Sequence, residues 1–367
     1  MTQAATLVGD VTVPLFGILM CTVPAVTRPT LQFGVRVPPA RAGAAVIRRQ
    51  RRAYYWRSAV VVIGCTAAAI TLRGSGPWWL PRTILLLEMI ADAACFGLAR
   101  RRIIAVKTAE GWFAGVRQTV VADTSWRTRP QRFPVRWLVP AIAVLAATFV
   151  TGVVRYPHLP GYVGTGLATL GNRQVPRSPA SAFAMVIGQL YVTCIWTGLL
   201  VLVYRSRPDI DPADPAGSLR RYRTLLDAFV RASLTLLALV DLTLLLAALQ
   251  QWRLYELNGA SAALLVLPAA AGMLLLIAVA IRAGRVRARA AAAAVPAGRA
   301  AAAGRDDDRF WKAGMVYINR ADPAVMVTAR VGVGWTLNLG NPAAWLIIGA
   351  IIATVAGLAV IRITTGV

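Results

Sequence analysis

Two carboxylates, Glu88 and Asp92, lie inside the apolar stretch Thr83–Ala99, which reads TILLLEMIADAACFGLA. Residues four apart share one face of a helix, so a helix over this stretch places both side chains together. A third carboxylate, Asp241, lies in the apolar run Ala232–Gln250. An ionised carboxylate in hydrocarbon is unfavourable, so we expect all three to face the interior of a helix bundle. We also expect at least one acid of the close pair to be protonated near neutral pH, unless an Arg or a cation lies beside it.

Intramembrane acids allow two interpretations. One is a route for protons or cations, because chains of acidic side chains recur in pumps and transporters. The other is structural, with each carboxylate paired with an Arg or accepting a hydrogen bond and so orienting its helix. Amide variants distinguish the two interpretations, since a pathway loses activity when the charge is removed while the fold is kept.

The elements that carry these acids are predicted membrane spans. Of the 367 residues, 57% are hydrophobic and only 15% are charged, whereas a soluble domain holds about 25% charged residues. Several apolar runs of roughly 18–22 residues have the length that crosses the hydrocarbon of a bilayer. We therefore predict an all-α membrane protein, a polytopic bundle of about eight transmembrane helices. The predicted spans are Val11–Val26, Ser58–Leu72, Thr83–Ala99, Trp137–Val154, Ser181–Tyr204, Ala232–Gln250, Ser261–Ile281 and Ala343–Ile361.

The net charge of +25 would suit a nucleic-acid partner, but the positions of the basic residues favour a membrane orientation. Alternate connections between the predicted spans hold 33 of the 40 Lys and Arg residues. Such an excess marks the cytoplasmic side. We predict a multi-pass protein of the bacterial cytoplasmic membrane with both termini outside. Its basic loops contact anionic lipid headgroups, and no nucleic-acid partner is expected.

Enzyme motifs are missing from the sequence. It has no H-E-x-x-H and no G-x-x-x-x-G-K-[ST], and the pair Gly332 and Gly334 is too short a motif for dinucleotide binding. His158 is the sole histidine, so neither a metal site nor a cofactor is expected. The cysteines all fall within predicted spans and are expected to pack as free thiols.

Three connections have a composition of their own. The outer loop within residues 155–180 is rich in Pro and Gly and is expected to be irregular. On the inner side, Ala42–Arg57 is expected to form a basic helix along the membrane surface. Residues 282–305 are Ala/Arg-rich and suit a flexible linker. The predicted division is 1–281 for a seven-helix region, 282–305 for the linker, 306–341 for a small cytoplasmic motif and 342–367 for the last helix.

The most polar, motif-like part of the chain is Asp306–Asn338. Within it, Met315–Asn319 and Val325–Arg330 suit short strands with a turn between them, which predicts a small β-hairpin. About 33 residues cannot build an independent core. We therefore expect this hairpin to lie against the inner membrane face, anchored by Trp311 and Trp335.

Within this tail, the run D-R-x-W-K-x-G, then Y-x-N, D-P and R-x-G-x-G-W-T-x-N, resembles a short C-terminal domain of unknown function in bacterial membrane proteins. That domain usually has Lys before the Arg, where this chain has Ala329. Upstream, T-R-P-x-x-x-F-G-V-R-V-P and Y-P-H-L-P are similar to the integral membrane family that includes the immunity protein against the sporulation-delaying toxin. The loop of that family usually continues as I-P-x-H, and this chain instead reads V-G-T-G at residues 163–166. The residues that carry the resemblance are Phe33, Gly34, Arg36, Pro38, Tyr156, Leu159, Pro160, Trp311, Lys312, Gly314, Tyr317, Asn319, Asp322, Pro323, Arg330, Gly332, Gly334, Trp335 and Asn338.

The resemblance implies an uncharacterised bacterial membrane protein, with toxin immunity and signalling in one branch of the family. The expected function is therefore that of a receptor-like immunity or signalling protein, which senses an extracellular peptide and holds a cytoplasmic regulator. The alternative is a proton- or cation-coupled transporter that uses the three intramembrane carboxylates. Transport in vesicles and the sensitivity of a deletion strain to a secreted peptide separate these two functions.

Overall fold

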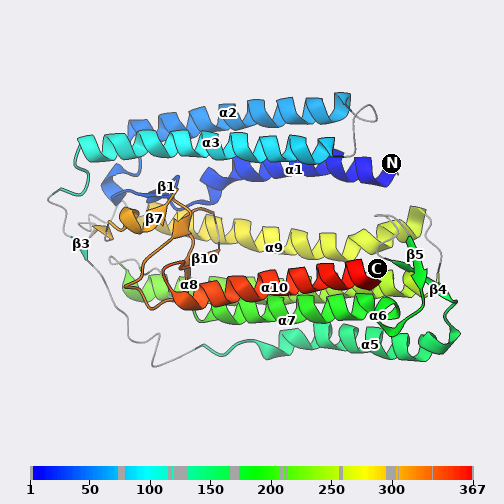
Figure 1. Cartoon of the computed structure of the whole chain (residues 1–367). Coiled ribbons are helices and arrows are strands. Elements are labelled where there is room, and N and C mark those ends of the chain that lie inside the picture. Colours follow the sequence, from blue (N-terminus) through cyan, green and yellow to red (C-terminus); the bar gives the residue numbers. More distant parts are fainter. Residues whose placement is uncertain are drawn as a thin grey trace. The chain divides into compact units, whose positions relative to one another are not determined.

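The structure is a computed structural model that describes residues 3–72, 79–114, 118–119, 131–165, 173–206, 208, 210, 214–255, 259–294, 303–304, 306–332 and 334–365. Long helices dominate these residues (Figure 1). They are α1 (Gln3–Val26), α2 (Ala45–Thr71), α3 (Leu80–Ala109), α5 (Val139–Arg155), α6 (Pro179–Ala182), α7 (Ala184–Tyr204), α8 (Pro215–Gln251), α9 (Gly259–Ala294) and α10 (Pro342–Thr365). The strands are short: β1 (Leu31–Gln32), β2 (Val35–Arg36), β3 (Gln118–Thr119), β4 (Tyr162–Thr165), β5 (Arg173–Pro176), β6 (Ala303–Gly304), β7 (Trp311–Lys312), β8 (Val316–Tyr317), β9 (Met326–Thr328) and β10 (Trp335–Leu337).

Several of these helices have the length and apolar composition of a membrane-embedded protein. Within the described residues, five helical segments are long and apolar enough to cross a membrane: Ala45–Thr71, Val135–His158, Ala184–Tyr204, Pro215–Gln251 and Leu267–Val286. Shorter apolar segments occur in α1 and α10, and α3 carries too many charges to meet the same criterion. The eight predicted spans all coincide with helical segments, but eight membrane crossings remain a prediction.

Four helices continue past their predicted spans, each at the end that the charge distribution assigns to the inside. The helix α2 begins at Ala45, α3 runs on to Ala109, α8 begins at Pro215 and α9 runs on to Ala294. Ala and Arg are strong helix formers, so little in these basic stretches ends a helix. The basic helix expected at Ala42–Arg57 is present from Ala45 on, as the first half of α2, and its position along the membrane surface stays a prediction.

The described chain forms two compact units. The first contains Met1–Trp126, Arg207–Arg220 and Ile281–Asn341, and the second contains the remaining residues. Both α8 and α9 contribute residues to each unit. The predicted domain boundaries divide the chain into consecutive segments, whereas each compact unit combines segments that are far apart in the sequence. The predicted boundaries stay a prediction. The first half of the predicted linker at 282–305 belongs to α9, and residues 295–302 lie outside the described part.

In the first unit, α1, α2 and α3 pack side by side (Figure 1). Buried residues recur three and four apart along α3, which is the spacing of a single helix face. At the middle of this face, the ring of Phe96 lies 5.5 Å from that of Phe33, whose other neighbour is the ring of Tyr54 at 5.3 Å. Polar residues occupy both ends of the apolar middle. The buried residues of this face are Ile84, Glu88, Asp92, Cys95, Phe96, Ala99, Ile103 and Lys107.

In the second unit, the outer loop contains an ordered hairpin in which β4 and β5 pair antiparallel. The prediction of a wholly irregular loop was therefore wrong. Leu159, Val163 and Val175 pack in one apolar cluster with Trp252, which follows α8. This cluster explains why the loop adopts regular pairing despite its Pro and Gly content.

The tail after α9 forms two hairpins rather than one. The strand β7 pairs with β8, and β9 pairs with β10. The predicted strands at Met315–Asn319 and Val325–Arg330 do contain β8 and β9, but these two do not pair with each other in the described ladders. The segment between them instead wraps around the side chain of Asn338, whose amide donates to the backbone oxygens of Asn319, Asp322 and Ala324.

Candidate functional site

Two turns bring the tail against the loop that follows α1. Phe33 and Gly34, with φ of 50° and 70°, join β1 to β2 in a two-residue connection. Two successive residues at positive φ are the mark of a type I′ hairpin turn. Ala313 and Gly314, with φ of 50° and 78°, follow β7. A Cβ atom on Gly34 would lie 2.4 Å from the carbonyl oxygen of Gly314, so the backbones approach closely because Gly34 has no side chain.

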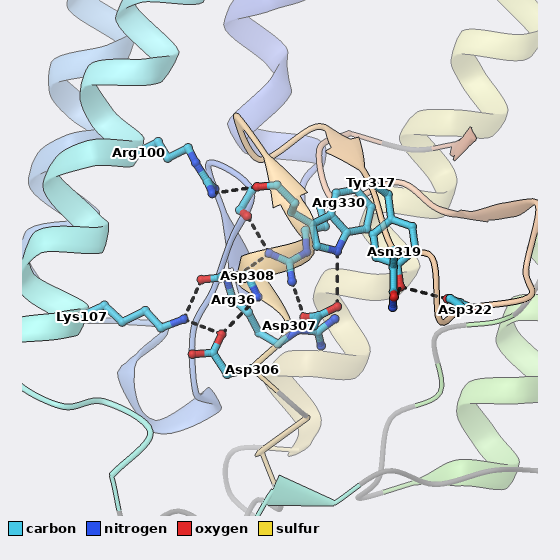
Figure 2. Close-up of polar contacts among 12 residues, drawn as sticks. Arg36, Arg100, Lys107, Asp306, Asp307, Asp308, Tyr317, Asn319, Asp322 and Arg330 are labelled. Carbon is cyan, nitrogen blue, oxygen red and sulfur yellow. Dashed lines mark hydrogen bonds and ion pairs between the residues drawn. The ribbon is translucent and has the colours of Figure 1, made fainter. Parts of the chain in front are cut away.

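Arg330 is the centre of an ionic cluster beneath these turns (Figure 2). Its side chain is 1% exposed, and its guanidinium pairs with the carboxylates of Asp307 and Asp308. The same guanidinium donates to the carbonyl oxygen of Gly34 at 2.9 Å and lies 4.8 Å from the centre of the Trp311 ring. A planar group with five donors can satisfy two carboxylates and a carbonyl at once.

Donor groups from the N-terminal part of the first unit reach the same acids. The Nε of Arg36 lies 2.9 Å from Asp307, and the backbone N–H of Arg36 donates to Asp308 at 3.0 Å. The ammonium of Lys107, near the end of α3, lies 2.8 Å from Asp306 and 2.6 Å from Asp308. Figure 2 shows these side chains converging from α3, from the loop after α1 and from the tail.

Hydrogen bonds extend the attachment on both sides of the ionic cluster. Arg100 of α3 donates to the carbonyl oxygens of Phe33 and Trp311 at 3.4 and 3.3 Å. The backbone N–H of Gly332 donates to the hydroxyl of Thr27, the residue after α1, at 3.0 Å. The tail is thus bound to the ends of α1 and α3 by charged and polar contacts, and Val331 adds an apolar contact with the cluster around Phe33 and Phe96.

Asp308 contacts Arg330, Lys107 and the backbone N–H of Arg36. Burial by itself would raise its pKa, but the Arg330 guanidinium, the Lys107 ammonium and the backbone N–H of Arg36 outweigh this effect and hold the pKa of Asp308 below its ordinary value of 3.8. The carboxylate is therefore ionised wherever the protein is folded at neutral pH. Its partners are all donors, as a carboxylate that is kept charged requires.

Acid should weaken the attachment of the tail through Asp308. Because its pKa is depressed in the folded protein, the ionised group stabilises the fold above pH 3.8, and this stabilisation is lost as the pH falls through the folded-state pKa. We expect the melting temperature of the full-length protein in detergent to fall from about pH 5 to about pH 2. The Asp308→Asn variant should melt lower at pH 5 and converge with the native chain in acid. An equal pH dependence of the two proteins would contradict this account.

A second polar network shapes the loop between β8 and β9. The hydroxyl of Tyr317 donates to Asp322 at 2.9 Å and accepts from the Asn319 amide at 3.0 Å. Asn338 is wholly buried, and its side-chain oxygen accepts from the backbone N–H groups of Asn319 and Gly340. These residues therefore hold the shape of the tail, which positions Arg330 for its contacts.

The family-motif residues separate into groups in the structure. The ionic cluster and the Asn338 network bring together Phe33, Gly34, Arg36, Trp311, Gly314, Tyr317, Asn319, Asp322, Arg330 and Asn338. Tyr156, Leu159 and Pro160 belong to the second unit. There, Arg177 donates to the carbonyl oxygen of Leu159 at 2.7 Å and lies over the Tyr156 ring.

Some motif residues do not take the roles that were expected of them. Trp311 is buried against Tyr317 and Arg330, so the prediction that it anchors the tail to the membrane was wrong. The side chain of Lys312 is exposed, as is that of Pro323. Pro38 is buried where it precedes a short 3₁₀ helix at Pro39–Arg41. Gly332 and Gly334 take φ of 69° and 150°, and Trp335 begins β10 half-buried.

Glu88, Asp92 and Asp241 are all buried, but their surroundings differ. Asp241, in the second unit, accepts hydrogen bonds from the Thr193 hydroxyl, at 3.0 Å for the shorter contact. Its backbone oxygen accepts from Gln189 at 3.0 Å. Glu88 and Asp92 have no hydrogen-bond partner within the described residues. The structural interpretation therefore suits Asp241 better than it suits the other two.

Sequence reasoning missed the partners on which the site depends. Lys107 and the run Asp306–Asp308 were not recognised as a site, although Lys107 is one of two lysines in the chain and acids are scarce overall. Three successive acids in a basic protein were a usable signal. Ser58 and Gly17, which adjoin Glu88 and Asp92, gave no signal, because a Ser or a Gly in an apolar helix is ordinary.

Comparison with known proteins locates one similarity, in the tail. Residues 320–345 match a family of unknown function (DUF5808). The match covers Asp322, Arg330, Trp335 and Asn338, and it ends within the first turn of α10. No curated protein and no solved structure matches the chain. The match therefore supports the resemblance of the tail to an uncharacterised domain.

Proposed function

We propose that this chain is a receptor-like immunity or signalling protein of the bacterial cytoplasmic membrane. In this proposal the outer loops meet an extracellular peptide, and the tail acts on a cytoplasmic regulator. Both termini lie outside, and the basic helix ends lie inside, next to anionic headgroups. No catalytic step is required of such a protein.

The observation that carries the proposal is the attachment of the tail to the ends of α1 and α3. Arg330, Asp307 and Asp308 join it to Arg36 and to Lys107. A displacement of either helix must move or break these contacts, because ion pairs depend on close geometry. A tail bound in this way can report on a change within the membrane bundle.

The outer hairpin β4–β5 is the proposed contact for the peptide. Tyr162 is 60% exposed at the start of β4, while the opposite face of the hairpin is fixed by the cluster around Trp252. An exposed aromatic side chain on a rigid support is a suitable anchor for a peptide.

The proposal predicts that deleting the gene sensitises the cells to a peptide that they secrete themselves. The native chain should restore resistance, and Tyr162→Ala should restore it less well at the same membrane abundance. Trp56→Ala is the matched control, because Trp56 is an equally exposed aromatic residue on α2, at the end predicted to be cytoplasmic. Unchanged sensitivity of the deletion strain to its own culture medium would refute immunity.

A second candidate function is proton- or cation-coupled transport. It is favoured by Glu88 and Asp92, which are buried without hydrogen-bond donors among the described residues. Buried acids without a fixed positive partner are typical of ion pathways. Asp241 gives less support, because Thr193 already satisfies it.

A further inference from the structure

Four carboxylate oxygens inside the first unit lack a donor. Glu88 is 0% exposed and Asp92 is 2% exposed, and none of their oxygens accepts a hydrogen bond in the part of the chain that the structure describes. Ionised oxygens in a low-dielectric interior need donors or a counter-charge. The pair is therefore an incomplete arrangement that a positively charged occupant would complete.

A third polar side chain, that of Ser58, lies beside the pair from α2. Ser58 is wholly buried, and its hydroxyl makes no hydrogen bond within the described residues. It lies beside the Asp92 carboxyl. From α1, Gly17 lies close to the other acid, since a Cβ atom there would lie 2.2 Å from the Val62 Cγ2 and 2.5 Å from the Glu88 Oε1. Residues of three helices thus meet at the two acids.

The charged and titratable neighbours do not neutralise the carboxyls of Glu88 and Asp92. Cys21 of α1, with Tyr54 and Cys65 of α2, lies close enough to interact electrostatically with the acids, and none of these side chains is a cation. Arg57 of α2 interacts with Cys95, and its Nη1 is buried without a hydrogen-bond partner. Within the described residues, then, the two carboxyls receive no hydrogen bond from a basic side chain.

We propose that Glu88, Asp92 and Ser58 form a binding site for one small monovalent cation, with Na⁺ as the ion to test. Carboxylate and hydroxyl oxygens are hard ligands, which suit a hard cation. A pair that retains one proton has a single negative charge, which one monovalent ion neutralises.

This site deepens the transport candidate and rests on it only for its physiological use, because binding can be measured without flux. The full-length protein in detergent should bind radioactive ²²Na⁺ saturably, with one site per chain. Glu88→Gln and Asp92→Asn should each weaken binding at least about tenfold, and Ser58→Ala should weaken it less. Asp241→Asn is the control and should bind as the native chain does. Thermal unfolding identifies variants that are folded.

Binding that is absent in the folded native chain, or unchanged in both Glu88→Gln and Asp92→Asn, would overturn the site. Saturable binding without ²²Na⁺ or proton flux in vesicles would keep the site and refute transport. Flux that both acid variants retain would support transport and refute a role for this site in it.

Discussion

Replacing Arg330 by Ala is expected to lower the free energy of unfolding by about 3–5 kcal/mol, because it leaves two acids without their shared cation. The guanidinium is almost wholly buried and also donates to Gly34. Asp307 and Asp308 retain 25% and 18% exposure, so water can solvate them in part, and we expect the lower end of this range. The measurement is thermal unfolding of the full-length protein in detergent, with the rate of proteolysis of the tail as a second readout.

Arg320→Ala is the matched control for this experiment, because Arg320 is an exposed basic residue of the same tail. It should change the melting temperature little, since exposed charges contribute about 0–1 kcal/mol. If Arg330→Ala melts together with Arg320→Ala, the cluster does not hold the tail.

The helices could be predicted because their signal is local. Apolar runs identified every long helix, and the i, i+4 spacing correctly placed Glu88 and Asp92 on one buried face. Their ends could not be predicted from hydropathy. Where α2, α3, α8 and α9 leave the predicted spans, Ala and Arg continue the helix, and hydropathy does not register helix propensity.

The pairing of the tail strands could not be predicted because a distant residue decides it. The positions of β8 and β9 follow from their own sequences, and a turn between them was a reasonable expectation. Asn338 lies after both strands in the sequence, and its amide donates to three backbone oxygens of the connection between them. A pattern-based prediction treats each strand with its neighbour in sequence and omits such a side chain.

The ionic cluster was hidden by sequence distance. Lys107 and Asp306 are separated by 199 positions, and Arg330 reaches Gly34 across 296. The motifs included both Arg330 and Gly34, but they did not predict that these two residues contact each other. The extension of α3 beyond its predicted span is what brings Lys107 within reach of the tail.

Replacing Gly34 by Ala is expected to destabilise the protein by about 2–5 kcal/mol, through two separate costs. A left-handed conformation costs an L-residue about 1–2 kcal/mol, and Gly34 has φ of 70°. Overpacking adds about 1–3 kcal/mol, because the new Cβ would meet the backbone of Gly314 rather than a side chain that can move. The melting temperature of the full-length protein and the proteolysis of the tail are the measurements.

Gly43→Ala is the control for the close approach, since a Cβ atom there meets nothing within 4 Å and the residue lies in the same connection. It should leave the melting temperature near that of the native chain. Gly34→Ala should also expose the tail to protease, because the carbonyl oxygen that Arg330 contacts belongs to Gly34 itself. If the two variants melt alike and resist protease alike, the backbone contact between Gly34 and Gly314 does not hold the tail to α1 and α3.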